Sequence, residues 1–519
     1  MTIQQKTFTT NFSVWLFLLG LFCRTVTSFA AEHYVTPPGG YGANNPPYTN
    51  WADAATNIQW AVSAATNGET VYVTNGIYAL TNQILITNGI ILKSVNGYTN
   101  TTVLGNGSNR CFYVAGGIGG WPTIDGFTIT NGYARSNDYS GNGGGLQVSS
   151  GNVYNCLITG NRTDNLSTNT IWGQGGGGGM NLEGGCTVLT CIIRGNYGRY
   201  GGGVHARDAT ICISNCIISE NTAYLNGGGI MGLGFLKKST IISNNASLQN
   251  GGGIYTTREM FITNSVVVEN YAAGNGGGVA LFNAFTMDNS SISQNVSKID
   301  GGGVYLSSSS AYMAPEIRNS VIADNAASNS GGGLYFYNGG IAKQCLIEKN
   351  AIRPSSGSGC NGAGAYLLNI VNNTGYVVSC TIASNSGAQF GGGIAVSGTN
   401  NSYCVSNCIV WKNIATNTDG GNDIKDISGP TNRNAFNFTC ASYTNFPPES
   451  WNITNDPQFV DITGGNYRLS ANSPCVNSGS NQDWMTNSFD LDGRQRIRYG
   501  TVDMGAFEHI HGGSIYTFH

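Results

Sequence analysis

The chain has 519 residues, a length that suggests several compact domains or a repeat array, because single hydrophobic cores stop growing well below this size. It contains 76 Gly without a three-residue period, which excludes a collagen-like chain, and only 10% of its residues are charged. Its formal net charge of -3 gives no electrostatic reason to expect nucleic acid or an anionic membrane as a partner.

Residues 1–30 are predicted to be an export signal. Lys6 is the only charge before an apolar run from Val14 to Phe22, and Ser28-Phe29-Ala30 then offers a cleavage site for a signal peptidase. The run is too short to span a bilayer, and no later run predicts a transmembrane helix. We therefore expect an exported protein, extracellular or on the outer-membrane surface. The alternative is a buried N-terminal helix.

Residues 31–120 are predicted to form an N-terminal cap and the first, less regular coils of a solenoid. Within them, residues 51–66 carry apolar side chains at helical spacing, which predicts an amphipathic helix that closes the N-terminal end. Strand-like runs follow at 71–73 and 84–92.

Residues 121–450 contain a repeat of about 25 residues, which is the period of a solenoid. Ten segments end in Asn, with Ile or Val three residues before it and Cys, Ser or Thr five residues before it. Most are followed by a Gly triplet and then Val, Ile or Leu, as in Gly251 to Ile254. The ten Asn are Asn161, Asn196, Asn221, Asn245, Asn270, Asn295, Asn325, Asn350, Asn385 and Asn413.

Each repeat holds short Ile- and Val-rich runs broken by Asn and Gly, with no room for a helix of three turns. This predicts an all-β, right-handed parallel β-helix in which coils rise by about 4.8 Å, the strand spacing. The Ile and Val positions are expected to fill the interior. The Asn are expected at a bend, in left-handed backbone, with amides that bond the next coil.

The cysteines of the repeats are expected to be buried thiols, because they share one inward ladder with Ser and Thr. Closely spaced pairs such as Cys212 and Cys216 lack the His or acidic partners of a zinc site. Cys440 and Cys475 lie outside the ladder and are the better candidates for a disulfide.

Residues 451–519 show no repeat and are predicted to close the C-terminal end. They contain three acids, Asp490, Asp492 and Asp503, whose carboxylates are candidate calcium ligands. The alternative is that these acids fix local turns or pair with Arg494 and Arg496. No other cofactor is expected.

The Gly-Gly-x-Ile and Ile-x-x-Asn repeats resemble those of the chlamydial polymorphic outer-membrane proteins, over about residues 140 to 415. The ending, with DPQFV from Asp456, SPCVNSG from Ser473, DLDGR from Asp490 and VDMGAFE from Val502, resembles the choice-of-anchor Q ending of bacterial secreted β-helix proteins. The start, from His33, is similar to that of pectate-lyase-like β-helices. These resemblances imply the fold and export, and they imply no activity, since one scaffold hosts many functions.

Charged residues at similar offsets after three Gly triplets form the best candidate for catalysis. They are His205, Arg207, Asp208, Lys237, Lys238 and Arg258. On one face they would suit a lyase that acts on an acidic polysaccharide. The alternative is a set of scattered, solvated charges. The tripeptides expected of a polygalacturonase-like hydrolase, Gly-His-Gly and Arg-Ile-Lys, do not occur.

Four tyrosines follow the apolar residue after a Gly triplet: Tyr255, Tyr305, Tyr335 and Tyr366. If the apolar residue faces inward, the rings face outward and offer a row on which sugars stack. The alternative is an aromatic ladder that stabilises the sheet. The first hypothesis for function is accordingly a secreted or surface protein, adhesin-like or structural, that binds an extracellular polysaccharide or cell-surface glycan. The second is a polysaccharide lyase.

Overall fold

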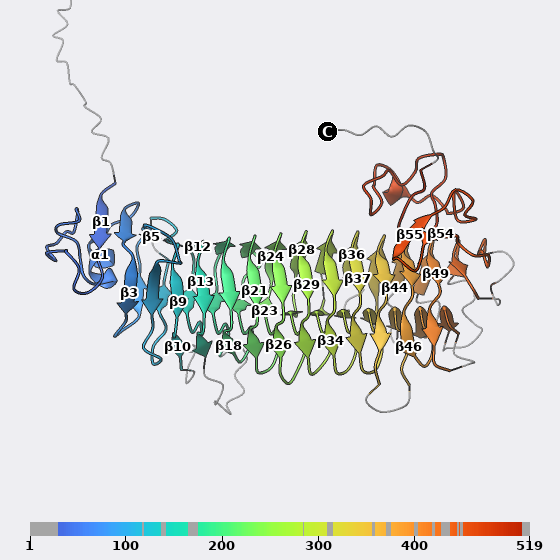
Figure 1. Ribbon diagram of the computed structural model, residues 1–519, viewed down its shortest axis with the longest axis horizontal. Coiled ribbons are helices and arrows are strands. Elements are labelled where there is room, and N and C mark those ends of the chain that lie inside the picture. The colour runs from blue at the N-terminus through green and yellow to red at the C-terminus, as the bar shows by residue number, and fades with distance from the viewer. Residues whose placement is uncertain are drawn as a thin grey trace, which may run out of the picture.

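The computed structural model of the chain is a right-handed parallel β-helix whose coils stack along one axis into a straight rod (Figure 1). The structure describes residues 30–116, 119–135, 142–163, 175–283, 285–308, 315–354, 359–369, 375–398, 403–417, 421–426, 436–443, 446 and 450–510. The predicted export signal therefore lies, except for Ala30, outside the described residues. Among the described residues, no helix is both long and apolar enough to cross a bilayer.

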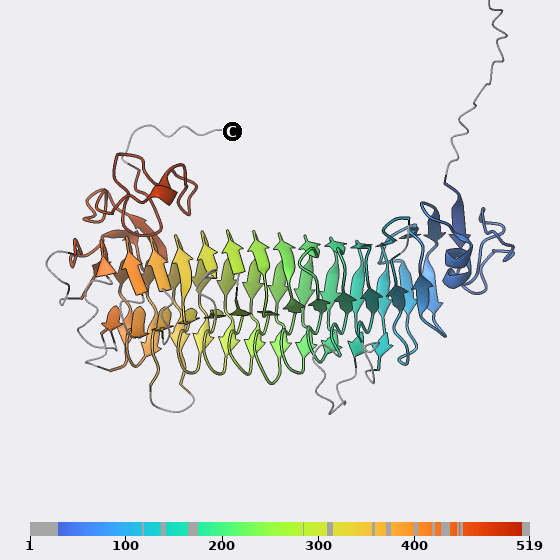
Figure 2. The same cartoon turned by 180° about the vertical axis from the view of Figure 1, so that it is seen from behind.

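Each regular coil gives one strand to each of four parallel sheets. In one central coil these are β28 (Met260–Thr263) in sheet 1, β29 (Val266–Val268) in sheet 2, β30 (Tyr271–Ala272) in sheet 3 and β31 (Val279–Phe282) in sheet 4. Over the described residues the four sheets have 15, 14, 11 and 13 strands, respectively. Figure 2 shows the same stack from behind, with strands in register from coil to coil.

Sheet 4 carries the candidate site. Its strands are β4 (Ile84–Ile86), β7 (Phe112–Val114), β11 (Leu146–Val148), β15 (Met180–Leu182), β19 (Val204–Ala206), β23 (Ile230–Gly232), β27 (Ile254–Thr256), β31, β35 (Val304–Ser307), β39 (Leu334–Tyr337), β43 (Ala365–Asn369), β47 (Ile394–Gly398) and β51 (Ile424–Asp426).

The predicted aliphatic ladder fills the interior. In sheet 2, Ile193 pairs with Ile218, Ile218 with Ile241 and Ile241 with Val267, and all four side chains are fully buried. Burial of such a continuous apolar column supplies the main driving force for the fold. One position differs from the prediction. Ile241 enters the interior, not Ile242, because this coil reaches its turn one residue early.

The Asn ladder runs through ten coils, with Asn244 in the place predicted for Asn245. The Asn270 side-chain oxygen accepts hydrogen bonds from the backbone N–H (2.9 Å) and the side-chain amide (3.0 Å) of Asn244, and its own amide donates to the Ile241 carbonyl at 2.9 Å. The predicted bonding between coils is confirmed. The predicted left-handed backbone is wrong, since it belongs to the preceding residue, such as Glu269 with φ 56°.

Asp423 ends this ladder. Its Oδ1 accepts hydrogen bonds from the backbone N–H and the side-chain amide of Asn413, both at 3.0 Å. Its Oδ2 accepts from the backbone N–H of Ser442. A carboxylate thus replaces the amide of a further Asn, and satisfies donors that would otherwise be buried without partners.

The Cys and Ser ladder works in the same way. The backbone N–H of Cys191 points at the Cys216 sulfur (3.4 Å), and that of Cys216 donates to the Ser239 hydroxyl (3.1 Å). In this structure no S–S bond joins any of the thirteen cysteines in the described part of the chain. Outside this ladder, burial raises the pKa of the Cys186 thiol to about 11, so this thiol stays protonated.

The Gly triplets let neighbouring coils approach closely. A Cβ on Gly252 would lie 2.3 Å from the Gly277 carbonyl oxygen, and Gly251 has φ +69°. A side chain at either position would clash or be strained, which explains why the triplets recur.

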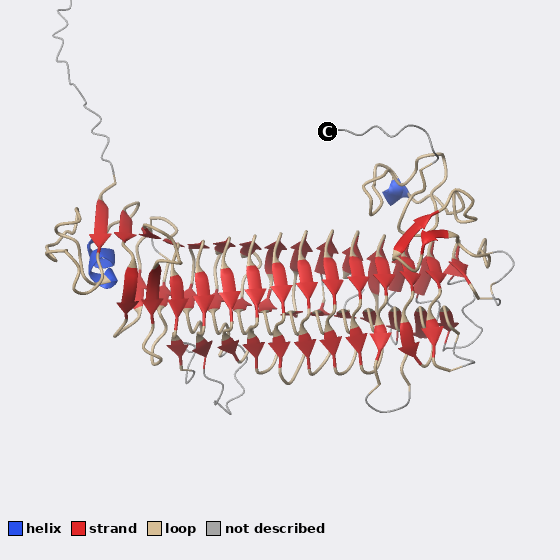
Figure 3. Cartoon of the chain, in the orientation of Figure 1, coloured by secondary structure: helices blue, strands red, loops and turns tan. Residues whose placement is uncertain are grey.

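Among the residues that the structure describes, helix is confined to short pieces near the two ends (Figure 3). The helix α1 (Ile58–Ala64) begins at Asn57, whose side chain accepts from the Gln59 N–H, and it buries Ile58, Ala61 and Val62 against the core. The predicted helix over residues 51–66 was too long, because residues 51–57 form turns.

The C-terminal unit contains the antiparallel pair β54 (Phe459–Asp461) and β55 (Asn466–Leu469) and the short η2 (Asp483–Met485). It lies beside the last coils, not across their open end (Figures 1 and 2). Tyr467 and Ala506 pack on Leu346 and Ala383 of sheet 2. Its first residues do reach that end, since Ile453 pairs with Cys440 at the end of sheet 2. The predicted closure of the end by residues 451–519 therefore stays a prediction. At the end itself, the partly buried rings of Tyr443 and Phe446 pack on the core.

Candidate functional site

The second residue of each strand in sheet 4 points away from the interior, and we call this column the outer row. Its members pair in register from coil to coil. They include Gln147, Asn181, His205, Met231, Tyr255, Ala280, Tyr305, Tyr335, Tyr366 and Ala395. The Gly triplets flank this row closely, since a Cβ on Gly251 would lie 2.8 Å from the Tyr255 Cβ.

The tyrosines of the outer row are buried. Tyr255, Tyr305, Tyr335 and Tyr366 are 6%, 9%, 6% and 7% exposed. The rings of Tyr305 and Tyr335 stack with centroids 5.2 Å apart, and Tyr335 meets Tyr366 edge-on at 5.3 Å. Burial raises the pKa of Tyr305 to about 12. The prediction of an exposed row of rings is wrong, because the rings cover one another and the flanking triplets cover their bases; the environment is that of the alternative, an aromatic ladder.

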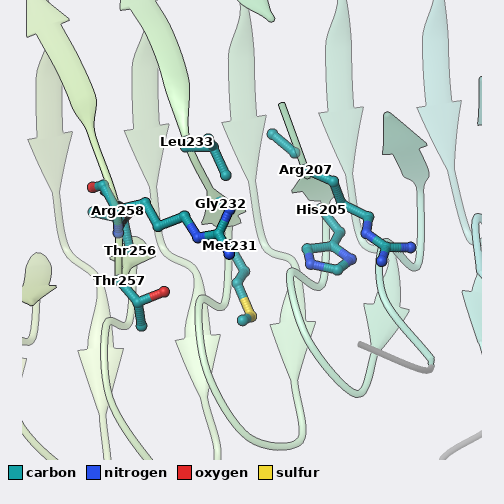
Figure 4. Close-up of a pocket in the computed structure, with 9 residues that line it drawn as sticks. His205, Arg207, Met231, Gly232, Leu233, Thr256, Thr257 and Arg258 are labelled. Atoms are coloured by element: carbon teal, nitrogen blue, oxygen red, sulfur yellow. Dashed lines mark hydrogen bonds between the residues drawn. The ribbon is translucent and has the colours of Figure 1, made fainter. Parts of the chain in front are cut away.

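A pocket of about 200 Å³ opens where the outer row changes from polar to aromatic residues. Nine residues of three successive coils line it: His205, Ala206, Arg207, Met231, Gly232, Leu233, Thr256, Thr257 and Arg258 (Figure 4). The pairing of β23 with β27 stops after Met231, whereas on its other side Gly232 still pairs with Ala206 of β19. A Cβ on Gly232 would lie 1.9 Å from the Ala206 carbonyl oxygen. Glycine is therefore required for the shape of this wall.

His205 lies at one side of the pocket and is only 6% exposed. Its Nδ1 is buried and has no hydrogen-bond partner among the described residues. Burial, together with the charge of Arg207, lowers the pKa of His205 to about 3. The imidazole is therefore neutral at physiological pH and a weak base.

Two arginines flank this imidazole. Figure 4 shows Arg258 extending along the pocket toward Gly232, while Arg207 lies on the far side of His205. A hydrogen bond from the Arg258 N–H to the Thr256 hydroxyl, at 3.1 Å, fixes the turn that presents the arginine. Arg207 makes an exposed contact with Glu183 at 3.5 Å. Guanidinium groups at an open pocket suit carboxylate or sulfate groups of a ligand.

A family model described as "Right handed beta helix region" matches residues 162–322, which contain all nine residues that line the pocket. This chain is a right-handed parallel β-helix protein. The solved structure of pectate lyase Pel9A aligns with 93% of this chain and 97% of its own, at 16% identity and a TM-score of 0.34. No curated protein matches the sequence.

Three other basic or acidic candidates lie apart from the pocket lining. The Asp208 Oδ1 accepts from the Thr210 N–H (2.8 Å) and hydroxyl (2.5 Å), which lowers its pKa and closes a local turn. Lys237 ends β24 (Gly234–Lys237) in sheet 1, with its Nζ 5.0 Å from the centre of the Phe235 ring. Lys238, with φ 47°, makes the turn that follows. The pocket therefore unites His205, Arg207 and Arg258 only.

The acids of the C-terminal unit are engaged by the chain itself. Asp490 accepts from the N–H groups of Arg494 and Glu508, both at 2.7 Å. Asp503 accepts from the N–H groups of Asn477 (2.7 Å) and His509 (2.6 Å). Asp492 pairs with the guanidinium of Arg468 at 2.5 and 2.7 Å and with that of Arg494 at 3.1 Å. These contacts match the alternative of turn-fixing and paired carboxylates, and calcium stays an untested prediction.

Sequence reasoning missed Gly232 and the two threonines of the pocket, Thr256 and Thr257. One signal was available. Among the described strands of sheet 4, only β23 has Gly in third place, and this shows in the sequence as Met231-Gly232 after a triplet. A glycine inside a strand marks a bulge or a close backbone approach.

Proposed function

We propose that this is an exported β-helix protein that binds an acidic polysaccharide at the pocket between Arg207 and Arg258. The observation that carries the proposal is that Arg207 and Arg258 line one pocket on either side of His205, on the flank of a straight rod. A polysaccharide chain can bind across such a flank without passing through a closed channel. Arginine side chains can form bidentate hydrogen bonds with its carboxylates. Export is supported by the signal-like pattern of residues 1–30.

Binding is favoured over cleavage by the chemistry of the lining. A lyase must remove a carbon-bound proton, and a general base does this best when its pKa lies near the working pH. The buried imidazole of His205, with its pKa lowered to about 3, is a poor base. None of the nine residues that line the pocket is Asp or Glu. The lining supplies positive charge and a shaped wall, which hold a ligand.

The test is binding of polygalacturonate, compared with a neutral glucan, by calorimetry at low salt. We expect the wild type to bind the acidic polymer, and Arg258→Ala and Arg207→Ala each to weaken binding about tenfold or more, as loss of one charge-assisted contact predicts. Lys237→Ala is the matched control, because it removes the same charge from sheet 1 and leaves the pocket intact.

Two results would overturn the proposal. One is equal weakening by Lys237→Ala and Arg258→Ala, which would mean non-specific attraction to charge. The other is the appearance of unsaturated sugar absorbance with the wild type that is lost with Arg258→Ala, which would make the protein a lyase.

A further inference from the structure

Two thiols meet where the C-terminal unit packs on the last coil. Cys440 lies in β53 (Cys440–Ala441), the last strand of sheet 2, where it pairs with Ile409. Cys475 comes from the C-terminal unit. Both are fully buried in one apolar cluster with Ile409, Leu469 and Met504. The two thiols lie within hydrogen-bonding reach of each other.

This pair differs from the cysteines of the interior ladder. The Cys408 sulfur receives the backbone N–H of Cys380 at 3.5 Å, so it has a bonding role between coils. The Cys440 side chain points out of the lumen instead, since its strand partner Ile409 packs on the C-terminal unit and its thiol bonds the Asn455 carbonyl at 3.3 Å. A bond between Cys440 and Cys475 would leave the ladder intact.

We propose that Cys440 and Cys475 form a disulfide that fastens the C-terminal unit to the β-helix. The proposal rests on the export included in the proposed function, because disulfides persist in oxidising compartments. Two S–H bonds break and one S–S bond forms. The S–S bond of an export-compartment oxidoreductase breaks in exchange, and the two electrons and two protons from the thiols convert it to a dithiol.

The bond secures a unit that, apart from the continuous backbone, contacts the β-helix through non-covalent interactions. The Gly505 N–H donates to the Asn407 carbonyl at 2.8 Å, and the Ala506 N–H donates to the Thr381 hydroxyl at 3.0 Å. Such hydrogen bonds break and re-form in local fluctuations of the structure. A covalent link would keep the C-terminal unit next to the β-helix while they are broken, so that the same hydrogen bonds form again.

The experiment refolds the full chain in a buffer of reduced and oxidised glutathione, blocks free thiols in denaturant, and maps a non-reduced digest by mass spectrometry. We expect a linked peptide pair that contains Cys440 and Cys475, lighter by two hydrogens than the separate peptides. Cys380 and Cys408 are the internal control and should be recovered as blocked thiols. Recovery of Cys440 and Cys475 as blocked thiols from folded protein would overturn the proposal.

A variant separates the link from folding in general. Cys475→Ser should fold, as circular dichroism will show, and trypsin should release its C-terminal unit severalfold faster than that of the oxidised wild type. Adding reductant should bring the wild type to the same rate. If reductant leaves the wild-type rate unchanged, the link is absent and the proposal fails. Refolding needs no export, and the link lies far from Arg258, so failure of polysaccharide binding or of secretion would leave this result unaffected.

Discussion

The Asn ladder and the outer row both place one residue in every regular coil, yet they differ in how they use it. The ladder has Asn at all ten positions, each nearly or fully buried and each bonded to the coil before it. The outer row changes along the rod, from Gln147 and Asn181 through His205 and Met231 to a run of tyrosines.

The difference shows which positions the fold dictates. Every coil must satisfy the same buried donors and acceptors at its bend, and one side chain does so best. The side chains of the outer row need not satisfy buried donors and acceptors. Some of them therefore pack against one another, and others line a pocket. Substitutions that test function should therefore be made in the outer row, and substitutions that test stability should be made in the Asn ladder.

The largest expected effect is the loss of a ladder residue. Asn244→Ala removes the acceptor for Asn221 and the donor to the Ile218 carbonyl, both buried, and should cost about 3 kcal/mol or more of unfolding free energy. Asn245→Ala, one residue later, should cost less than about 0.5 kcal/mol because sheet 3 already has Ala at the equivalent positions 326 and 351. Urea denaturation measures both. Equal costs would contradict the ladder register seen here.

The next effect concerns the aromatic part of the outer row. Tyr335→Ala removes a ring that contacts both Tyr305 and Tyr366 and should cost about 3 kcal/mol. Tyr335→Phe keeps the stacking and should cost less than about 1 kcal/mol. Met231→Ala, in the half-exposed part of the same row, should also cost less than about 1 kcal/mol. If Tyr335→Ala proved as mild as Met231→Ala, the tyrosines would be available for ligands after all.

The repeat predicted the coil, its interior of stacked Ile and Val side chains and the bonding between coils, because these features recur and each recurrence reinforces the others. The repeat does not show whether Asn244 or Asn245 belongs to the ladder. The two residues are adjacent, and the length of one turn determines which of them lies in register with the other ladder Asn. The repeat also could not predict that Tyr305 and Tyr335 are buried. The alternation of side chains along a strand predicts that these tyrosines face outward. Whether they contact solvent depends on how closely the Gly triplets pack against them, which the repeat does not show.

The candidate site was predictable only in part. Equal offsets after the triplets rightly placed His205, Arg207 and Arg258 near one another. The same logic failed for Lys237, because the chain has already entered sheet 1 there. The position of a side chain after a loop depends on where the next strand begins, and loops between coils vary in length.

A smaller effect is expected from Asp300, which lies next to the aromatic part of the outer row and should make the stability of the protein depend on pH. Asn226, Asn250 and Asn275 precede it in an outer ladder of the same kind, and Asp300 accepts from the Asn329 amide at 2.8 Å and the Ser330 N–H at 3.0 Å. Burial raises the pKa of Asp300 to about 6. A raised pKa means stability that is present below the unfolded pKa and lost as pH rises through about 6.

Asp300→Asn should therefore stabilise the protein at slightly alkaline pH, by about 1 kcal/mol given the partial exposure of this group, and the gain should vanish below about pH 4. Asn275→Asp is the reverse variant and should lose stability as pH rises. Thermal melts at several pH values measure both. A gain from Asp300→Asn that is independent of pH would show that folding leaves the pKa of this carboxyl group unchanged.

The smallest expected effect is no effect at all, and it concerns His205. With its pKa lowered to about 3, this imidazole stays neutral, and polymer carboxylates stay ionised, between about pH 5 and pH 8. Affinity for polygalacturonate should therefore be flat across that window at constant salt. Met231→His offers a positive control, because a half-exposed imidazole in the next coil would titrate near its ordinary pKa and tighten binding at the acidic end. If the wild type itself binds more tightly as pH falls through this window, then His205 gains a proton there and contributes a positive charge, and the pocket is a pH-responsive site and not the fixed pair of guanidinium groups described above.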